Sequence, residues 1–289
     1  MTLAQGTWQQ ILVFDHYGEL LALVHNSLVA GAALGLVGGL VGVFVIMRDL
    51  PFAVHGISEL SFAGASAALL LGVNVVAGSI VGSLMAAGAI GLLGARARDR
   101  NSVIGVIMPF GLGLGVLFLA LYKGRAANKF GLLTGQIVAV DTPQLSWLLG
   151  TSAVVLVALA VMWRPLVFAS ADAEVAEARG VPVRGLSFAF MIVLGLAVAL
   201  SVQVVGALLV LTLVVTPAAA AARVTASPVL LPVLSVVFAV ASIEGGILLA
   251  LGGSIPISPY VTTLSFGIYL LCGRAGRKRA RTGGVDGKG

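Results

Sequence analysis

An imidazole and a carboxylate stand four residues apart in an apolar stretch of this sequence. They are His55 and Glu59, in the segment between Arg48 and Gly72 that Pro51 opens. On a helix this spacing places both side chains on one face, one turn apart. A neutral imidazole and a carboxylate together form a partial coordination shell for a divalent transition metal. The spacing therefore predicts a metal-binding face on a helix of membrane length.

Ionisable side chains at membrane depth are energetically costly, and they usually face a bundle interior or a water-filled path. The pair is therefore predicted to be one step of a pathway for a metal ion. The alternative is a structural, hydrogen-bonded pair that joins this helix to a neighbour. Glu244, in the segment SIEGGILL, is another carboxylate at membrane depth. It is expected either to complete a site with His55 and Glu59 or to pair with a polar group of a partner subunit.

The composition predicts that the elements around these residues are membrane helices. Of 289 residues, 59% are hydrophobic and 10% are charged, and the mean hydropathy is +1.11. A soluble domain carries roughly 25% charged residues. The net charge of +6 does not indicate a nucleic-acid partner, because Lys and Arg lie in short loops and in the tail. The single cysteine, Cys272, excludes an intrachain disulfide and a thiolate metal cluster.

The runs without formal charge predict an all-α, polytopic bundle of about eight to nine transmembrane helices, in a single domain over residues 1–289. The expected spans are residues 20–47, 53–72, 75–94, 101–122, 142–163, two short spans within 185–222 broken near Gln203 and Gly206, 225–251 and 260–273. Residues 1–20 are predicted to form an interfacial segment. Residues 123–143 are too polar to cross, and residues 274–289 form a basic tail.

The polar segment at residues 170–184 is predicted to form a short exposed helix. Asp172 is placed to cap its start, and Gly180 with Pro182 to end it. The distribution of positive charge puts this helix and the basic tail in the cytoplasm. The same count also places Arg48 and residues 95–101 in the cytoplasm, but it leaves Lys123, Arg125 and Lys129 outside.

Seven motifs follow one another along the chain. In order they are GLVGGLVGVFVIMRDL, HGISELSFAG, SVIGVIMPFGLGLGVLF, LLTGQIVAV, DAEVAEARGVPVR, VVGALLVLTLVVTPAAAAARVTA and GGSIPISPYVTTLSFG. In this order and spacing, over residues 20–273, they resemble the permease subunits of bacterial ABC importers for zinc, manganese and iron, the ABC-3 family. Members of the family usually carry an aspartate at the position of His55 and a histidine at that of Glu59. The acid and the base are therefore exchanged in this chain, and one of each is kept.

The resemblance implies a type II importer fold with two permease copies, a homodimer, on either side of the pathway. It implies a cytoplasmic ABC ATPase subunit and an extracytoplasmic metal-binding protein as partners. It also implies that residues 170–184 are the coupling helix that contacts the ATPase. The coupling residues expected from this are Asp172, Glu174, Ala176, Gly180, Val181 and Pro182.

The expected function is therefore that of a transporter subunit in the bacterial plasma membrane, surrounded by lipid, for zinc, manganese or ferrous iron. The sequence has no P-loop, no HExxH and no GxSxG, so ATP hydrolysis is assigned to a separate subunit and no enzyme activity is expected. No permanently bound cofactor is expected, because the metal passes through. The alternatives are a permease for a metal chelate such as haem, a siderophore or cobalamin, and a stand-alone secondary transporter.

Overall fold

The computed structural model describes residues 24–93, 97–124, 131–132, 140–251 and 257–283. All regular secondary structure among these residues is helical, which confirms the all-α prediction. Seven helices are long and apolar enough to cross a membrane, and a shorter apolar helical stretch covers Val210–Val224. The chain is thus a multi-pass membrane protein. The predicted interfacial segment at residues 1–20 and the middle of the polar segment at 123–143 lie outside the described residues.

The chain divides into two compact units, which we name by their first helices. The α4 unit is Met47–Leu211, and the α3 unit combines Met1–Ile46 with Thr212–Gly289. The α4 unit contains α4 (Pro51–Leu71), α5 (Val75–Leu93), α6 (Ala97–Leu121), α8 (Thr142–Ala171), α9 (Ala173–Ala178), α10 (Val183–Val205) and the 3-10 turn η2 (Ala207–Leu209). The α3 unit contains α3 (His25–Met47), α12 (Thr216–Val224), α13 (Leu230–Leu251) and α14 (Ile257–Gly283), with α11 (Val210–Val214) at the boundary.

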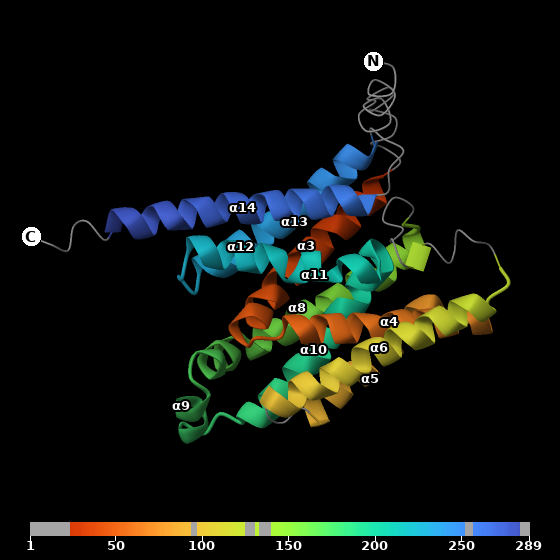
Figure 1. The fold of residues 1–289 in the computed structure, drawn as a ribbon, viewed down its shortest axis with the longest axis horizontal. Helices are drawn as coiled ribbons and strands as arrows, with labels where there is room; N and C mark the ends of the chain where they lie inside the picture. Colours follow the sequence, from red (N-terminus) through yellow and green to blue (C-terminus); the bar gives the residue numbers. More distant parts are fainter. Residues whose placement is uncertain (1–23, 94–96, 125–130, 133–139, 252–256, 284–289) are drawn as a thin grey trace, which may run out of the picture. The chain divides into compact units, whose positions relative to one another are not determined.

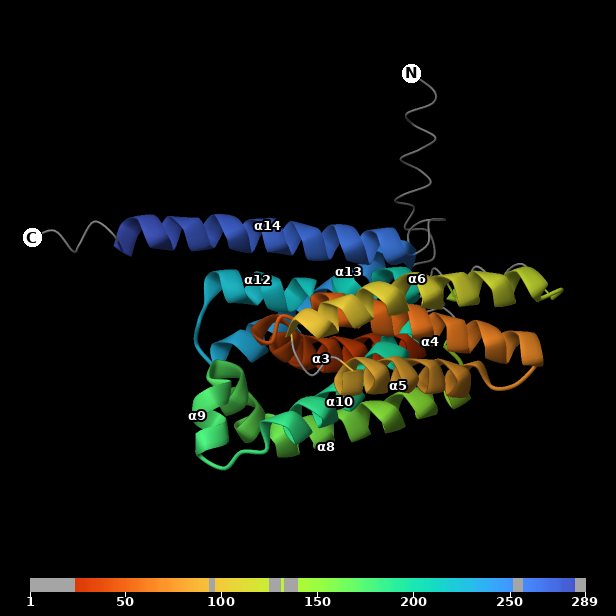
Figure 2. The ribbon, with the colours of Figure 1, turned by 60° about the horizontal axis from the view of Figure 1, so that its bottom comes forward.

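Helix α4 is held tightly between α5 and α6 in the α4 unit (Figure 2). Glycines make this approach possible, because a side chain on α5 would run into the backbone of α4. A Cβ atom at Gly82 would clash with the carbonyl oxygen of Leu60, and Gly64 faces Gly78 backbone to backbone. Close helix approach through small residues is a main source of stability in membrane bundles. The helix that carries His55 and Glu59 is therefore fixed in place by its neighbours.

This packing predicts that Gly82→Ala destabilises the protein. The added methyl group meets backbone, which cannot rotate away, and overpacking of this kind costs about 1–3 kcal/mol. Gly88→Ala is the matched control, since Gly88 lies on the same helix with no atom within 4 Å of the position of its Cβ. Thermal unfolding in detergent should show a lower Tm for the first variant and an unchanged or higher Tm for the second. Equal Tm values for the two variants would contradict the packing role.

Helices α3 and α13 of the α3 unit also meet along a row of glycines. Gly31, Gly35 and Gly39 of α3 face Glu244, Val240 and Val236 of α13, at matching four-residue intervals. The hydroxyl of Ser235 donates to the Gly39 carbonyl oxygen at 2.7 Å. The small residues of α3 therefore let the two helices pack closely. Helix α14 lies along α12 and α13 in the same unit (Figures 1 and 2).

The expected break near Gln203 and Gly206 is found where α10 ends, at Gly206, whose φ of 85° is a conformation that favours glycine. The residues after it form η2, α11 and α12 instead of one continuous span. Other helix boundaries also differ from the sequence prediction. Helix α8 continues past residue 163 to Ala171, despite the internal Pro165, because Leu166 and Ala169 are buried and hold the extra turns in place. Helix α14 continues to Gly283, so the first part of the predicted tail is helical.

Candidate functional site

The spacing of His55 and Glu59 brings their side chains together on α4, as predicted. The Nε2 atom of His55 lies 3.7 Å from Oε1 of Glu59. The Glu59 side chain is 7% exposed, whereas that of His55 is 29% exposed. The carboxylate is thus almost enclosed by the helices of the α4 unit, and the imidazole is the part of the pair that an incoming ligand can reach.

The separation of the two atoms suits a shared ligand better than a direct bond. A hydrogen bond between N and O normally spans about 2.7–3.2 Å, so 3.7 Å is too long for one. Nitrogen and oxygen ligands of a tetrahedral zinc ion lie about 2.0–2.2 Å from the metal, which places them about 3.4 Å apart. A small rotation of either side chain therefore brings the pair to the spacing of two metal ligands.

The pair alone is an incomplete coordination shell. No group of three or more His, Cys, Asp or Glu side chains in the described part of the chain is arranged to hold a metal ion. The hydroxyl of Ser58, on the next turn, donates to the His55 carbonyl oxygen at 2.8 Å. The Nδ1 atom of His55 is buried without a hydrogen-bond partner among the described residues, although permanent metal ligands usually have such a partner. The arrangement favours transient contact with an ion over permanent binding.

Gly111 of α6 is a part of this site that the sequence analysis did not single out. A Cβ atom at Gly111 would lie 2.9 Å from the backbone carbonyl carbon of Glu59. The backbone of α6 therefore closes over the turn of α4 that carries the carboxylate. The GLGLG spacing at residues 111–115 was a signal of close packing, but it does not reveal which helix packs there.

Glu244 lies on α13 in the α3 unit, whereas His55 and Glu59 belong to the α4 unit. A Cβ atom at Gly31 of α3 would lie 2.8 Å from the Oε1 atom of Glu244. This oxygen is buried and has no hydrogen-bond partner among the described residues. A buried carboxylate oxygen without a hydrogen-bond donor is costly at membrane depth. The Oε1 atom of Glu244 is therefore available to accept a hydrogen bond or to bind a cation. Its role in a metal pathway stays a prediction.

The short helix predicted at residues 170–184 is α9, a six-residue helix between α8 and α10. The N–H of Val175 donates to Oδ1 of Asp172 at 3.0 Å, so Asp172 is its N-cap. At its end, Gly180 adopts a φ of 85°, and the N–H of Val181 donates to the Ala176 carbonyl oxygen at 3.0 Å. This glycine-closed hydrogen-bond pattern is a common helix stop. The expected capping by Asp172 and Gly180 is confirmed.

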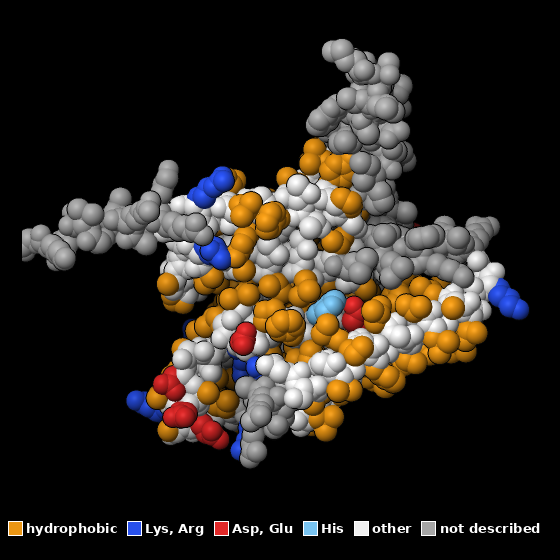
Figure 3. All heavy atoms as spheres, in the orientation of Figure 1, with side chains coloured by type: hydrophobic (Ala, Val, Ile, Leu, Met, Phe, Trp, Pro, Cys, Tyr) orange, Lys and Arg blue, Asp and Glu red, His pale blue; other side chains and the backbone are white. Residues whose placement is uncertain are grey.

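The side chains of α9 divide into a buried anchor and an exposed acidic surface. Ala176 is fully buried, while Asp172, Glu174 and Glu177 are exposed. Figure 3 shows acidic side chains gathered at this part of the α4 unit, in contrast to the hydrophobic surface along the long helices. Val181 is half-buried, and Pro182 is exposed at the start of α10. Helix α9 is therefore a rigid projection fixed at Ala176, although its contact with an ATPase remains a prediction.

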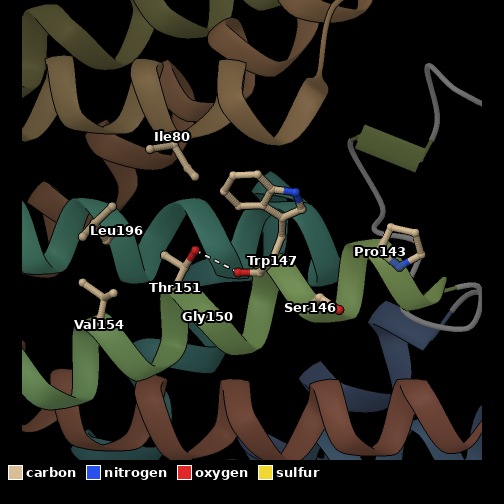
Figure 4. A pocket seen from close by; sticks show the side chains of 8 residues that line it. All are labelled: Ile80, Pro143, Ser146, Trp147, Gly150, Thr151, Val154 and Leu196. Carbon is tan, nitrogen blue, oxygen red and sulfur yellow. Dashed lines mark hydrogen bonds between the residues drawn. The ribbon is translucent and has the colours of Figure 1, made fainter.

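A separate hollow of about 730 Å³ lies between α5, α8 and α10 (Figure 4). It is lined mainly by apolar side chains, including Ile80, Trp147 and Leu196. The hydroxyl groups of Ser146 and Thr151 donate to carbonyl oxygens of their own helix, at 3.0 and 2.9 Å. None of the described residues that line it is ionisable. This hollow is therefore unsuited to an ion, and the His55–Glu59 pair remains the better candidate for the metal site.

Comparison with known proteins points to one family. The manganese transport system membrane protein MntC of Halalkalibacterium halodurans is 28% identical over 225 residues, covering 78% of this chain and 77% of MntC. The high-affinity zinc uptake system membrane protein ZnuB of Haemophilus influenzae is 26% identical over 250 residues, covering 86% of this chain and 96% of ZnuB. A chain in the structure of PsaBC from Streptococcus pneumoniae in complex with Fab superposes with a TM-score of 0.79 at 25% identity, covering 89% of this chain and 95% of that chain.

The family pattern itself extends over nearly the whole length of the described bundle. Residues 21–273 match the family described as ABC 3 transport family. The match includes α4 with its His55–Glu59 pair and the segment that forms α9. Because the pattern covers far more than half of the sequence, this chain belongs to the ABC 3 transport family.

Proposed function

We propose that this chain is the membrane permease subunit of an ATP-driven importer for a divalent transition-metal ion, with zinc and manganese as the leading candidates and ferrous iron as the third. The observation that carries the proposal is the family match over residues 21–273. It is supported by relatives named as manganese and zinc transport proteins. The metal is the transported substrate and not a resident cofactor.

The His55–Glu59 pair is the step of the pathway that this chain supplies. A carboxylate attracts a dication and its oxygens suit manganese, and an imidazole nitrogen is a good ligand for zinc and iron. Two ligands from one helix hold an ion weakly, and weak binding allows the ion to leave again. Glu244 is proposed as a further carboxylate on the same pathway. A bare ion suits these groups better than a chelate, which would need a wide apolar cleft and few carboxylates.

The proposal requires three partners. A cytoplasmic ABC ATPase supplies the energy and contacts α9 through Asp172, Glu174 and the turn at Gly180. An extracytoplasmic binding protein delivers the metal. A second copy of this chain lines the other side of the pathway, making a homodimer. The rigid attachment of α9 through buried Ala176 supports the coupling role, because a fixed helix transmits a push that a flexible loop would absorb.

The proposed function predicts that cells without this chain lose one transition metal. In a deletion strain of the native host, total zinc, manganese and iron are measured by inductively coupled plasma mass spectrometry in metal-limited medium. We expect one of the three metals to fall several-fold and to recover when the chain is restored. Unchanged contents of all three metals would contradict metal import.

A second measurement separates an ATP-driven importer from the alternatives. Affinity purification of the full chain from its native membrane should recover an ABC ATPase subunit. Metal uptake by the chain alone in liposomes, without an ATPase or ATP, would identify a secondary transporter instead. Uptake of haem, a siderophore or cobalamin, but not of free ions, by the complex with its ATPase would identify a chelate permease.

A further inference from the structure

Two arginines lie near the end of the α4 unit where α4 and α6 begin. Arg48 precedes α4, and Arg100 lies in the first turn of α6 whose side chains are described. Helices α4 and α6 run in the same direction, since Gly56 of α4 faces Ile104 of α6 and, further along both helices, Phe62 faces Gly115. Both arginines therefore lie at the same end of the unit, which the distribution of positive charge places on the cytoplasmic side.

Arg48 is oriented by α10. Its Nη2 atom donates to the hydroxyl oxygen of Ser187 at 2.5 Å, and the Ser187 hydroxyl in turn donates to the Val183 carbonyl oxygen at 2.7 Å. The guanidinium lies 5.8 Å from the centre of the Phe190 ring. These contacts hold the Arg48 side chain against the first turns of α10.

Each of the two guanidinium groups has an unused donor. Nη1 of Arg48 and Nε of Arg100 are buried and have no hydrogen-bond partner among the described residues. No Asp or Glu of the described residues forms an ion pair with either arginine. Burial, and then the positive charge of Arg100, lower the pKa of Arg48. Two like charges with buried free donors are unfavourable unless an anion lies between them.

We propose that Arg48, oriented by Ser187, and Arg100 form a phosphate-binding site for the headgroup of an anionic phospholipid of the cytoplasmic leaflet. Arginine donors match the oxygens of a phosphate group and bind it through several charge-assisted hydrogen bonds. Basic pockets between membrane helices on the cytoplasmic side are a common form of lipid headgroup site. The proposal does not depend on which ion is transported.

Phospholipid is favoured as the source because the adjoining surface is apolar. Phe52, on the first turn of α4, is 70% exposed, and Leu92 and Leu93, at the end of α5, are 69% and 65% exposed. Gly91 of α5 faces Phe188 of α10, and Ala87 faces Gly195, so the two helices run antiparallel. The C-terminal end of α5 therefore lies beside the N-terminal end of α10. Acyl chains of a bound lipid can pack on these side chains, whereas free phosphate would use only the charged groups.

The test is lipid binding by the full-length chain in detergent, measured by native mass spectrometry. Phosphatidylglycerol is the probe, and phosphatidylcholine serves as the zwitterionic comparison. We expect phosphatidylglycerol to bind about tenfold more weakly to Arg48→Gln and to Arg100→Gln, since each variant loses charge-assisted hydrogen bonds. Arg184→Gln is the matched control, because it removes an exposed arginine near the start of α10, and it should change binding less than twofold.

Competition by inorganic phosphate, together with the results of the variants, decides whether the proposal holds. Millimolar inorganic phosphate is added to the lipid-bound protein. If it displaces phosphatidylglycerol from wild type but does not alter lipid binding by Arg100→Gln, the same site also binds free phosphate. No displacement would assign the site to the lipid. Wild-type lipid binding by both variants would overturn the proposal, as would an equal loss in Arg184→Gln. If Arg48→Gln does not fold, Arg100→Gln and the charge-preserving Arg48→Lys decide the question, and both should bind the lipid more weakly than wild type.

Discussion

We expect Glu59→Gln to lower metal uptake per assembled complex by about tenfold or more, with the amount of complex unchanged. The substitution keeps the size of the side chain and removes the charge that attracts a dication. His55→Ala should have an effect of similar size, because it removes the nitrogen ligand. Losses of about 10–100-fold are common when groups that support a metal site are removed. Uptake of zinc, manganese and iron isotopes into cells, divided by complex recovered from the membrane, is the measurement.

Ser58→Ala is the matched control for these two variants. Ser58 is buried on the same helix and donates to the backbone of His55, so its removal disturbs the same turn while both proposed ligands remain. Uptake per complex in this variant should stay within about twofold of wild type. If the pair only stabilises the fold, Glu59→Gln and His55→Ala should reduce assembly and Tm, and the surviving complex should transport normally. That result would remove the pair from the metal pathway.

Exchanging the two residues provides a rescue experiment. The double variant with His55→Glu and Glu59→His carries the same two metal-ligand groups one turn apart on the same face of α4. It should recover a measurable part of the uptake that the single variants lose. Failure of the exchange, together with normal assembly, would show that the buried position must carry the carboxylate. Such a result would be consistent with the low exposure of Glu59, at 7%.

The second large effect is expected at the turn that ends α9. Gly180 has a φ of 85°, and a β-branched residue in this conformation costs about 1–3 kcal/mol. Gly180→Val should therefore displace the Val181–Pro182 turn while the long membrane helices stay folded. We expect stimulation of the partner ATPase by the permease, and metal uptake, to fall several-fold. Both are measured on complexes reconstituted in liposomes.

Gly185→Ala is the control for this experiment. Gly185 lies five residues further along, in α10, with no atom within 4 Å of its Cβ position and no positive φ. This variant should keep normal ATPase stimulation. Normal transport by Gly180→Val with full ATPase recruitment would contradict the coupling role of α9. A loss of the ATPase from the purified Gly180→Val complex would support it, because the contact itself would then be broken.

The sequence alone determined the features that depend on neighbours along the chain. Helical periodicity placed His55 and Glu59 on one face, and the structure confirms this at 3.7 Å. Capping chemistry located the start and end of α9 at Asp172 and Gly180. Long apolar runs identified the membrane helices, and Gly206 marked the break after α10. Each of these features follows from local backbone or side-chain physics, so no distant contact was needed to predict it.

The tertiary structure decided what distant residues contribute. Helix α8 extends past residue 163 because its last turns are buried, which no local signal at Pro165 indicates. The near-complete burial of Glu59 depends on the approach of α6 at Gly111, and the hydrogen bond between Arg48 and Ser187 joins two segments far apart in the sequence. The local conformational preferences of glycine and arginine are the same whichever helix packs against them. Their partners are set by packing between helices, because only the folded bundle brings those surfaces together.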